Sequence, residues 1–175
     1  MPELREGDFV YSFPNSWQVL KWDATHFHKK RFQSFGKESK AADLVAFDET
    51  GKQLWLIECK DFRPNGRTKT TDLCDEIAEK FKSTLAALVC ARNTDDSATQ
   101  RFARMALKKL HLRCAVHWEH PLQPHRLWPS VNMNRAAIRD KLRQRLYVAD
   151  PSAELGNSSQ LATVMPCTIR NSRNP

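Results

Sequence analysis

Apolar residues and turn residues follow one another most regularly in the middle of the chain, where they predict a β-hairpin. Residues 41–48 and 53–60 are expected to form its two strands, with residues 49–52 as the turn between them. A two-residue loop and a four-residue loop give the same strand register. In that register Asp43 lies directly opposite Glu58, and their side chains share one face of the sheet.

Helical and strand-like periodicities also extend to both sides of this hairpin. The pattern predicts a strand, a turn and a second strand within residues 7–22, a strand over 112–118 with one buried face, and helices over 23–35, 71–90, 97–110 and 135–147. This order indicates an α/β fold, with a small central mixed sheet flanked by helices. We expect a single domain over residues 1–150 and a flexible C-terminal tail over residues 151–175, where small and polar residues prevail.

Charged residues, Glu58-Cys59-Lys60, close the second hairpin strand. Because side chains alternate along a strand, Lys60 lies on the face of Glu58 and Asp43, while Cys59 points to the other face. Two carboxylates at one spot repel each other unless a cation joins them, and oxygen ligands suit a hard divalent cation. The alternative is an ion-pair cluster on a solvated sheet face. Against it stand the apolar residues on the face of the two acids, which are Val45, Phe47, Leu54 and Leu56.

An acid on one strand, followed by acid-any-lysine on the next, resembles the core motif of the PD-(D/E)xK nuclease-like superfamily. Asp43 matches the first acid of the motif, Glu58 the second and Lys60 the lysine, while Ala42 stands where the motif often has proline. The resemblance covers roughly residues 40 to 90. It implies a restriction-endonuclease-like core and Mg²⁺-dependent hydrolysis of phosphodiester bonds in DNA, with Mn²⁺ as a substitute.

The resemblance also implies roles for individual residues. Asp43, Glu58 and the main-chain carbonyl of Cys59 would hold the metal, and Lys60 would orient the attacking water or neutralise developing charge. Many members carry a further acid on a preceding helix, and Glu6, Asp23 and Glu38 all remain candidates for it. Some relatives have lost activity, so a non-catalytic nucleic-acid-binding or scaffold subunit is the alternative function.

Net charge favours a polyanionic partner. The 175 residues carry a formal charge of +8, and a basic helix over 135–147 contributes to it. DNA is the expected partner, and RNA is not excluded. A homodimer or a protein partner, as in phage-defence or repair systems, is expected only by analogy. The residues expected to contact phosphates are Lys40, Arg63, Arg67, Lys69 and Lys80.

Cysteine spacing, hydropathy and the absence of certain known motifs exclude several other classes of protein. Five cysteines, odd in number and without a C-x-x-C pair, suggest reduced thiols and a cytoplasmic location. No stretch is apolar enough for a membrane span, no secretory signal opens the chain, and no glycine-rich phosphate loop is present. A second possible metal cluster consists of His117, His120 and His125, but their spacing does not imply convergence.

Overall fold

The computed structural model describes residues 1–35, 39–64, 70–120 and 134–172. A five-stranded sheet forms its centre, in the order β3-β4-β5-β6-β7. The first two neighbouring pairs are antiparallel and the last two are parallel, so the sheet is mixed. The strands are β3 (Trp17–Lys21), β4 (Leu44–Asp48), β5 (Gln53–Asp61), β6 (His111–Glu119) and β7 (Glu154–Gly156).

The β4–β5 hairpin has the register that the sequence predicts. Leu44 pairs with Ile57 and Phe47 with Leu54, so the register continued by one residue sets Asp43 against Glu58. The turn is held by Asp48, whose Oδ1 accepts hydrogen bonds from the backbone N–H and the hydroxyl of Thr50, each at 3.1 Å. A Cβ atom at Gly51 would clash with the Asp48 carboxylate, so a larger residue there requires the Asp48 side chain to move.

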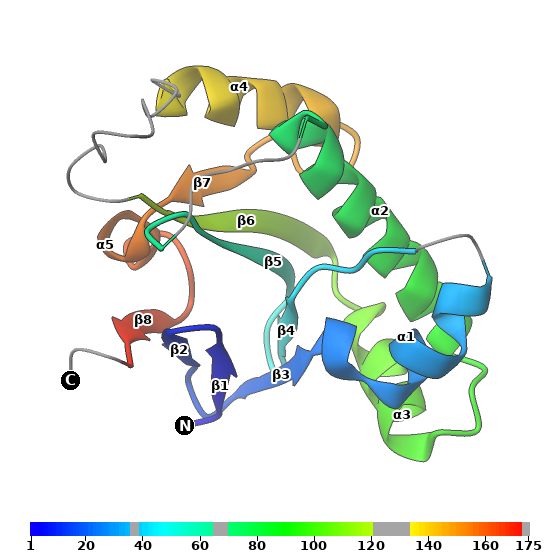
Figure 1. Cartoon of the computed structure of the whole chain (residues 1–175). Helices are drawn as coiled ribbons and strands as arrows, with labels where there is room; N and C mark the ends of the chain where they lie inside the picture. Colours follow the sequence, from blue (N-terminus) through cyan, green and yellow to red (C-terminus); the bar gives the residue numbers. More distant parts are fainter. Residues whose placement is uncertain (36–38, 65–69, 121–133, 173–175) are drawn as a thin grey trace.

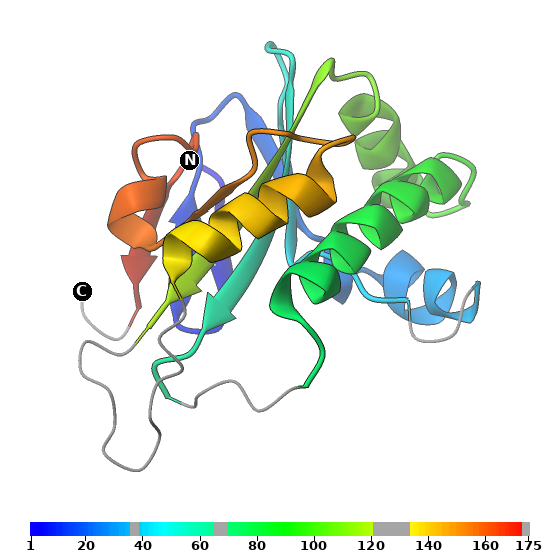
Figure 2. The same cartoon turned by 90° about the horizontal axis from the view of Figure 1, so that it is seen from above.

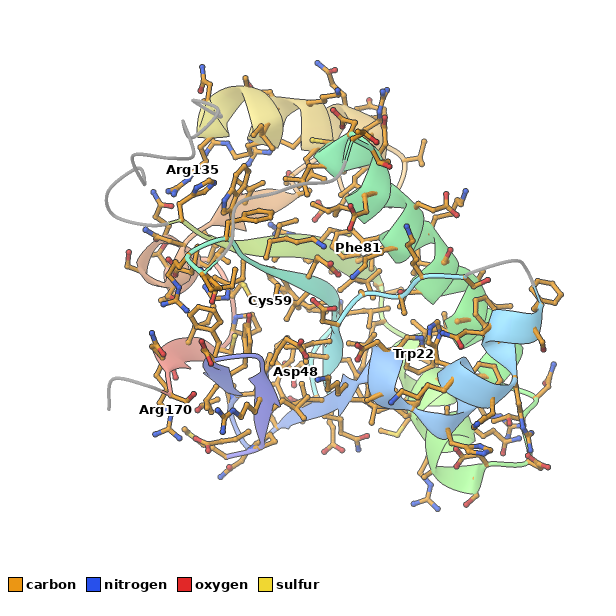
Figure 3. All side chains as sticks on the ribbon, viewed as in Figure 1. Trp22, Asp48, Cys59, Phe81, Arg135 and Arg170 are labelled. Carbon is orange, nitrogen blue, oxygen red and sulfur yellow. The ribbon has the colours of Figure 1, made fainter. Side chains whose placement is uncertain are left out.

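The two faces of the central sheet are buried by different layers. Helices cover one face, with residues of α1 (His26–Lys30), α2 (Leu73–Ala91), α3 (Ser97–Ala106) and α4 (Arg135–Leu146) in the core (Figure 1). A second, three-stranded sheet and the short helix α5 (Ser158–Leu161) cover the other face; that sheet has the order β1-β2-β8. Phe81 and Cys59, labelled in Figure 3, belong to these two opposite cores.

Helix α2 begins where the sequence predicts and packs against α4 (Figure 2). The Asp72 carboxylate caps it by accepting hydrogen bonds from the backbone N–H groups of Cys74 and Asp75. The basic side chains of α4 pair with acids of this first turn, Lys141 with Asp72 at 2.7 Å and Arg145 with Asp75 at 2.5 Å. These two cations therefore join the two helices.

The C-terminal segment differs from the flexible tail expected after residue 150. Strand β7 pairs in parallel with β6, and β8 (Thr168–Asn171) pairs with β2 (Phe9–Ser12) in the small sheet. Strand β1 (Glu3–Glu6) lies on the other side of β2. The short strands β7 and β8 are ordered by pairing with strands far away in the sequence, which local composition does not reveal.

Three further details differ from the sequence prediction. The expected helix over 23–35 is divided into η1 (Trp22–Ala24), α1 and η2 (Phe32–Ser34), and α1 is capped by Thr25. Helix α3 ends at Ala106 instead of near residue 110, and it is capped by Asp96, whose carboxylate accepts from the Thr99 backbone N–H. Strand β6 has two buried faces instead of one, because the small sheet and α5 cover the second face.

The mixed α/β architecture with a helix-flanked central sheet is confirmed, and membership of the restriction-endonuclease-like fold stays a prediction. Among the described residues, no helix combines the length and apolar character needed to cross a bilayer.

A buried hydroxyl on α2 fixes the segment just before β4, and this contact can be tested. Thr84 Oγ1 accepts a hydrogen bond from the Ala42 backbone N–H at 2.8 Å and donates to the Lys80 carbonyl at 2.7 Å. Thr84→Val keeps the side-chain shape but leaves that N–H unpaired, so we expect a loss of about 1–3 kcal/mol in the free energy of unfolding. Thr84→Ser retains the hydroxyl and should lose less. Urea denaturation measures both, and a valine variant as stable as the serine variant would contradict this role.

Candidate functional site

Asp43 is fixed at the point where the β4–β5 ladder ends. Its Oδ2 accepts a hydrogen bond from the backbone N–H of Cys59 at 2.7 Å, so the carboxylate takes the place of a ladder carbonyl. Its own carbonyl accepts from the backbone N–H of Trp22 at 3.0 Å. These two bonds hold the carboxylate beside β5 and leave Oδ1 to face α2.

Glu58 is buried completely, with a side-chain exposure of 0%. Its Oε1 accepts a hydrogen bond from the Lys80 ammonium at 2.5 Å and forms an ion pair with the Lys60 ammonium at 2.9 Å. Its Oε2 is buried and has no hydrogen-bond partner among the described residues. A buried carboxylate oxygen without a donor is costly, and it marks a place where a further cation or donor would be stabilised.

Helix α2 supplies two charged groups to the same spot. The Lys80 ammonium joins both acids, because it lies 3.4 Å from Asp43 Oδ1 as well as against Glu58. Lys60 also reaches Glu76 of α2, at 3.1 Å from its Oε1. Two lysines therefore connect three carboxylates, one directly before β4, one in β5 and one in α2. We call this network the carboxylate–lysine cluster (Asp43, Glu58, Lys60, Glu76 and Lys80).

The pKa values of two members of this cluster, Glu58 and Lys80, are shifted. The pKa of Glu58 is raised to about 7, first by burial and then by the Asp43 charge, and the two lysines offset this only in part. Burial lowers the pKa of Lys80, but the carboxylates of Glu58 and Asp43 outweigh it, so the net pKa is raised. The ion pairs of Glu58 thus do not compensate fully for its removal from water, which is common for buried pairs.

Two of the three candidates for the additional acid lie close enough to interact with Asp43. The pKa of Asp23 is raised by burial and next by the Asp43 charge. The pKa of Glu6 is also raised, mainly by burial, although Lys21 lies 2.7 Å from its Oε2. Glu38 lies outside the described residues. The choice between Glu6 and Asp23 stays open.

The residues fit a hard cation in their chemistry. A single ammonium already contacts an oxygen of Asp43 and an oxygen of Glu58, so one positive centre can serve both acids. Glu58 Oε2 offers a further buried acceptor. Within the described ranges no group of three His, Cys, Asp or Glu side chains is arranged to hold a metal. Mg²⁺ commonly uses only one or two carboxylates and completes its shell with water, so the pair Asp43 and Glu58 is chemically compatible with this ion.

The residues expected to contact phosphates have different surroundings. Lys80 lies within the cluster itself, and Lys40 lines a pocket beside it. Arg63 instead pairs with Asp61 at 2.7 Å and lies over the Phe9 ring, on the side of the small sheet. Arg67 and Lys69 lie outside the described residues.

The histidine group does not form a second metal site among the described residues. His117 is buried on the opposite face of the sheet, where Nδ1 lies 2.6 Å from the Tyr11 hydroxyl and Nε2 lies 3.1 Å from Glu119. His120 packs beside Trp118, and His125 lies outside the described residues. His117 therefore joins β6 to the small sheet.

Glu76 belongs to the cluster, although the sequence pattern did not single it out as a site residue. It lies four positions before Lys80, so both side chains lie on the same face of α2. The sequence does hold one indication of this role. An acid and a lysine at this spacing lie on the helix face that also carries the apolar residues Ile77 and Phe81.

A comparison with family models finds no match to this chain, and no curated protein or solved structure is significantly similar to it.

The raised pKa of Glu58 predicts a pH-dependent stability. Its pKa in the unfolded chain is near 4.5 and in the folded protein about 7. The folded state therefore binds the proton more tightly, and stability is lost as pH rises from 4.5 to 7. Glu58→Gln removes this loss, so in metal-free buffer it should gain on the order of 1–3 kcal/mol relative to wild type between pH 5 and pH 8.

Chemical denaturation at the two pH values measures that gain. Glu79→Gln is the matched control, because Glu79 is exposed on the same helix. A difference between Glu58→Gln and wild type that is the same at both pH values would show that the buried carboxyl does not titrate in this range.

Proposed function

We propose that this chain is a metal-dependent nuclease that hydrolyses phosphodiester bonds in DNA. The observation that carries the proposal is the convergence of Asp43 and Glu58, from neighbouring strands, on one shared positive group. Lys60 lies on the same face, 2.9 Å from Glu58. This is the residue set that the resemblance to PD-(D/E)xK nucleases implies, and its convergence supports the proposal.

The side chains have separable roles in this reaction. Asp43, Glu58 and the Cys59 carbonyl would hold Mg²⁺, which supplies Lewis-acid activation of the phosphate and of a bound water. Lys60 positions the attacking water and stabilises negative charge on the phosphorus oxygens. Water adds to phosphorus as the bond to one sugar oxygen breaks, and that oxygen takes up a proton. Glu76 holds the Lys60 ammonium in place at 3.1 Å.

The charge around the site supports a nucleic-acid substrate. Lys40 lies beside the cluster, and the chain as a whole carries a formal charge of +8. Phosphate groups are attracted to such a surface in a salt-dependent way. We propose DNA as the substrate, with RNA as the closest competitor.

A second candidate function is a non-catalytic nucleic-acid-binding or scaffold subunit. Lys80 favours it, because its ammonium bridges the two carboxylates and offsets part of their negative charge. In such a protein the carboxylate–lysine cluster would only stabilise the contact between β5 and α2.

We also propose a location and a partner for the protein. All five cysteines are free thiols, which agrees with a cytoplasmic location. A homodimer or protein partner would supply the sequence recognition that a compact catalytic domain lacks.

Removing the cluster should abolish cleavage without unfolding the protein. Asp43→Asn, Glu58→Gln and Lys60→Met are each expected to lower the rate of plasmid nicking in Mg²⁺ by about 10²-fold or more, because each removes charge stabilisation at the reacting phosphate. Lys82→Met is the control, since Lys82 is exposed on α2 and pairs with Glu79. Equal rates for all five proteins would refute the nuclease.

Metal binding separates the two candidate functions. A ligand that binds only the native state raises its melting temperature, so Mn²⁺ should stabilise the wild type and leave Asp43→Asn unchanged. The same samples are then titrated with duplex DNA at several salt concentrations. DNA binding that weakens steeply with salt, in a wild type that Mn²⁺ does not stabilise, would support the scaffold subunit instead.

A further inference from the structure

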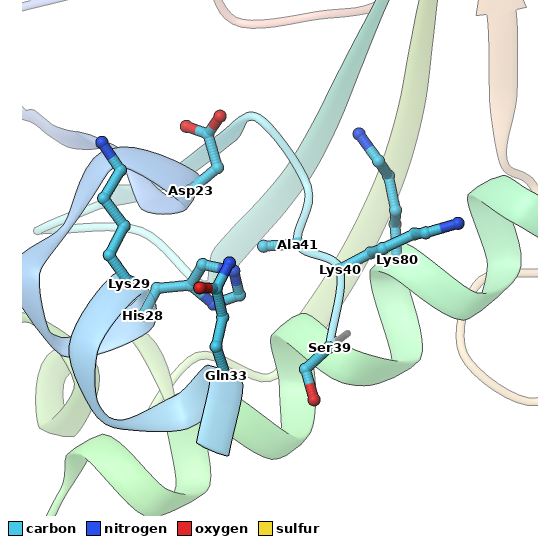
Figure 4. Close-up of a pocket in the computed structure, with 8 residues that line it drawn as sticks. All are labelled: Asp23, His28, Lys29, Gln33, Ser39, Lys40, Ala41 and Lys80. Atoms are coloured by element: carbon cyan, nitrogen blue, oxygen red, sulfur yellow. The ribbon is translucent and has the colours of Figure 1, made fainter. Parts of the chain in front are cut away.

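A pocket of about 570 Å³ opens directly beside the carboxylate–lysine cluster. Figure 4 shows two walls, one from the segment around α1 and the other from the segment before β4 together with α2. Lys80 belongs to both places, because it lines the pocket and binds Asp43 and Glu58. The lining residues are Asp23, His28, Lys29, Gln33, Ser39, Lys40, Ala41 and Lys80.

The charge of the pocket lining is predominantly positive. Lys29 stands on one wall, and Lys40 and Lys80 on the other (Figure 4). Asp23 is the single acid among the lining residues, and its pKa is raised by burial and by the neighbouring Asp43 charge. Lys29, Lys40 and Lys80 give the lining three positively charged residues, and the charge of Lys80 is shared with Asp43 and Glu58. Such a lining attracts an anion that carries more than a single charge.

His28 adds a buried polar group to this lining. Its exposure is 3%, and its Nδ1 has no hydrogen-bond partner among the described residues. The ring is held by α1 and stacks on Phe32 with centroids 6.0 Å apart. Burial, and then the nearby Lys29, lower the pKa of His28, so the imidazole is neutral at pH 7. A buried ring nitrogen without a partner is stabilised once a bound group supplies one.

We propose that this pocket binds the terminal phosphate monoester of a nucleic-acid strand, an inference that rests on the proposed function. A terminal phosphate carries a charge near −2 at neutral pH, whereas each internal phosphodiester carries −1. The lysines and the His28 ring therefore favour a strand end over the middle of a strand. The pocket volume lies within the range of small-ligand sites and accommodates the phosphate with its nucleoside.

This arrangement also selects the bond to be cut. Lys80 lines the pocket and also contacts both acids. When a terminal phosphate occupies the pocket, one of the first phosphodiester bonds of the strand therefore lies at Asp43 and Glu58. Hydrolysis of that bond adds water across a phosphorus–oxygen bond and gives a phosphate monoester and a hydroxyl, with no oxidant or reductant. The products would be mononucleotides or very short oligonucleotides.

Binding in EDTA tests the pocket independently of cleavage. Fluorescence anisotropy compares one oligonucleotide sequence in three forms, with a 5′-phosphate, with a 3′-phosphate and with hydroxyls at both ends. We expect one phosphorylated form to bind roughly tenfold tighter or more than the unphosphorylated form, as one charge-assisted hydrogen bond provides. Inorganic phosphate, added as competitor, should reduce this advantage.

Variants of the lining residues test whether the tighter binding of the phosphorylated oligonucleotide comes from the pocket. The double variant Lys29→Met/Lys40→Met and the single variant His28→Phe, which keeps an aromatic ring against Phe32, should both lose it. Lys30→Met is the matched control, because Lys30 is an exposed lysine on the same helix that does not line the pocket. Circular dichroism verifies that each variant is folded.

The results of these binding experiments can be distinguished from the results of the cleavage experiments that test the nuclease. Equal affinity for all three oligonucleotides, or an advantage that survives in the double variant, overturns the pocket proposal even if the protein cuts DNA. Inorganic phosphate binding without any preference among the oligonucleotides overturns it too. A preference that disappears in the pocket variants supports it, even in a protein that fails to cut.

Discussion

The burial of one carboxylate determines how this molecule is built around β5. Glu58 lies in the central sheet with no exposed surface, and a charge in that position must be matched by positive groups. Lys60 from the same strand and Lys80 from α2 supply them, which fixes the helix against the sheet. Compensation is incomplete, as the raised pKa of Glu58 shows. A site that holds a charge at a cost to stability is typical of functional sites, where a ligand or metal completes the balance.

The part of the site that the sequence predicts is the part formed by neighbouring strands. A two-residue period and a short polar turn suffice to set Asp43 against Glu58, and strand alternation sets Lys60 on the same face. The apolar character of that face distinguishes it from a solvated sheet surface. The helix-flanked mixed sheet is predicted for the same reason, because its hairpin and the helix beginning at Asp72 have strong local signals.

The part of the site that the sequence does not predict depends on contacts between segments far apart in the chain. No local pattern shows that Lys80 bridges the two acids or that Glu76 holds Lys60, since both need the packing of α2 on β5. Arg63 turns to Asp61 instead of the site, because a partner two residues away competes for it. Strands β7 and β8 have short, weakly apolar sequences and are ordered by the strands they join.

The position of a bound metal tests the central claim most directly. Crystals soaked in Mn²⁺, measured near the manganese absorption edge, locate the ion by its anomalous scattering. The proposed site predicts a peak bonded to Asp43 and Glu58, with the Lys80 ammonium displaced from its place between the two carboxylates. A map with no peak there, and Lys80 still bridging both acids at saturating Mn²⁺, would contradict it.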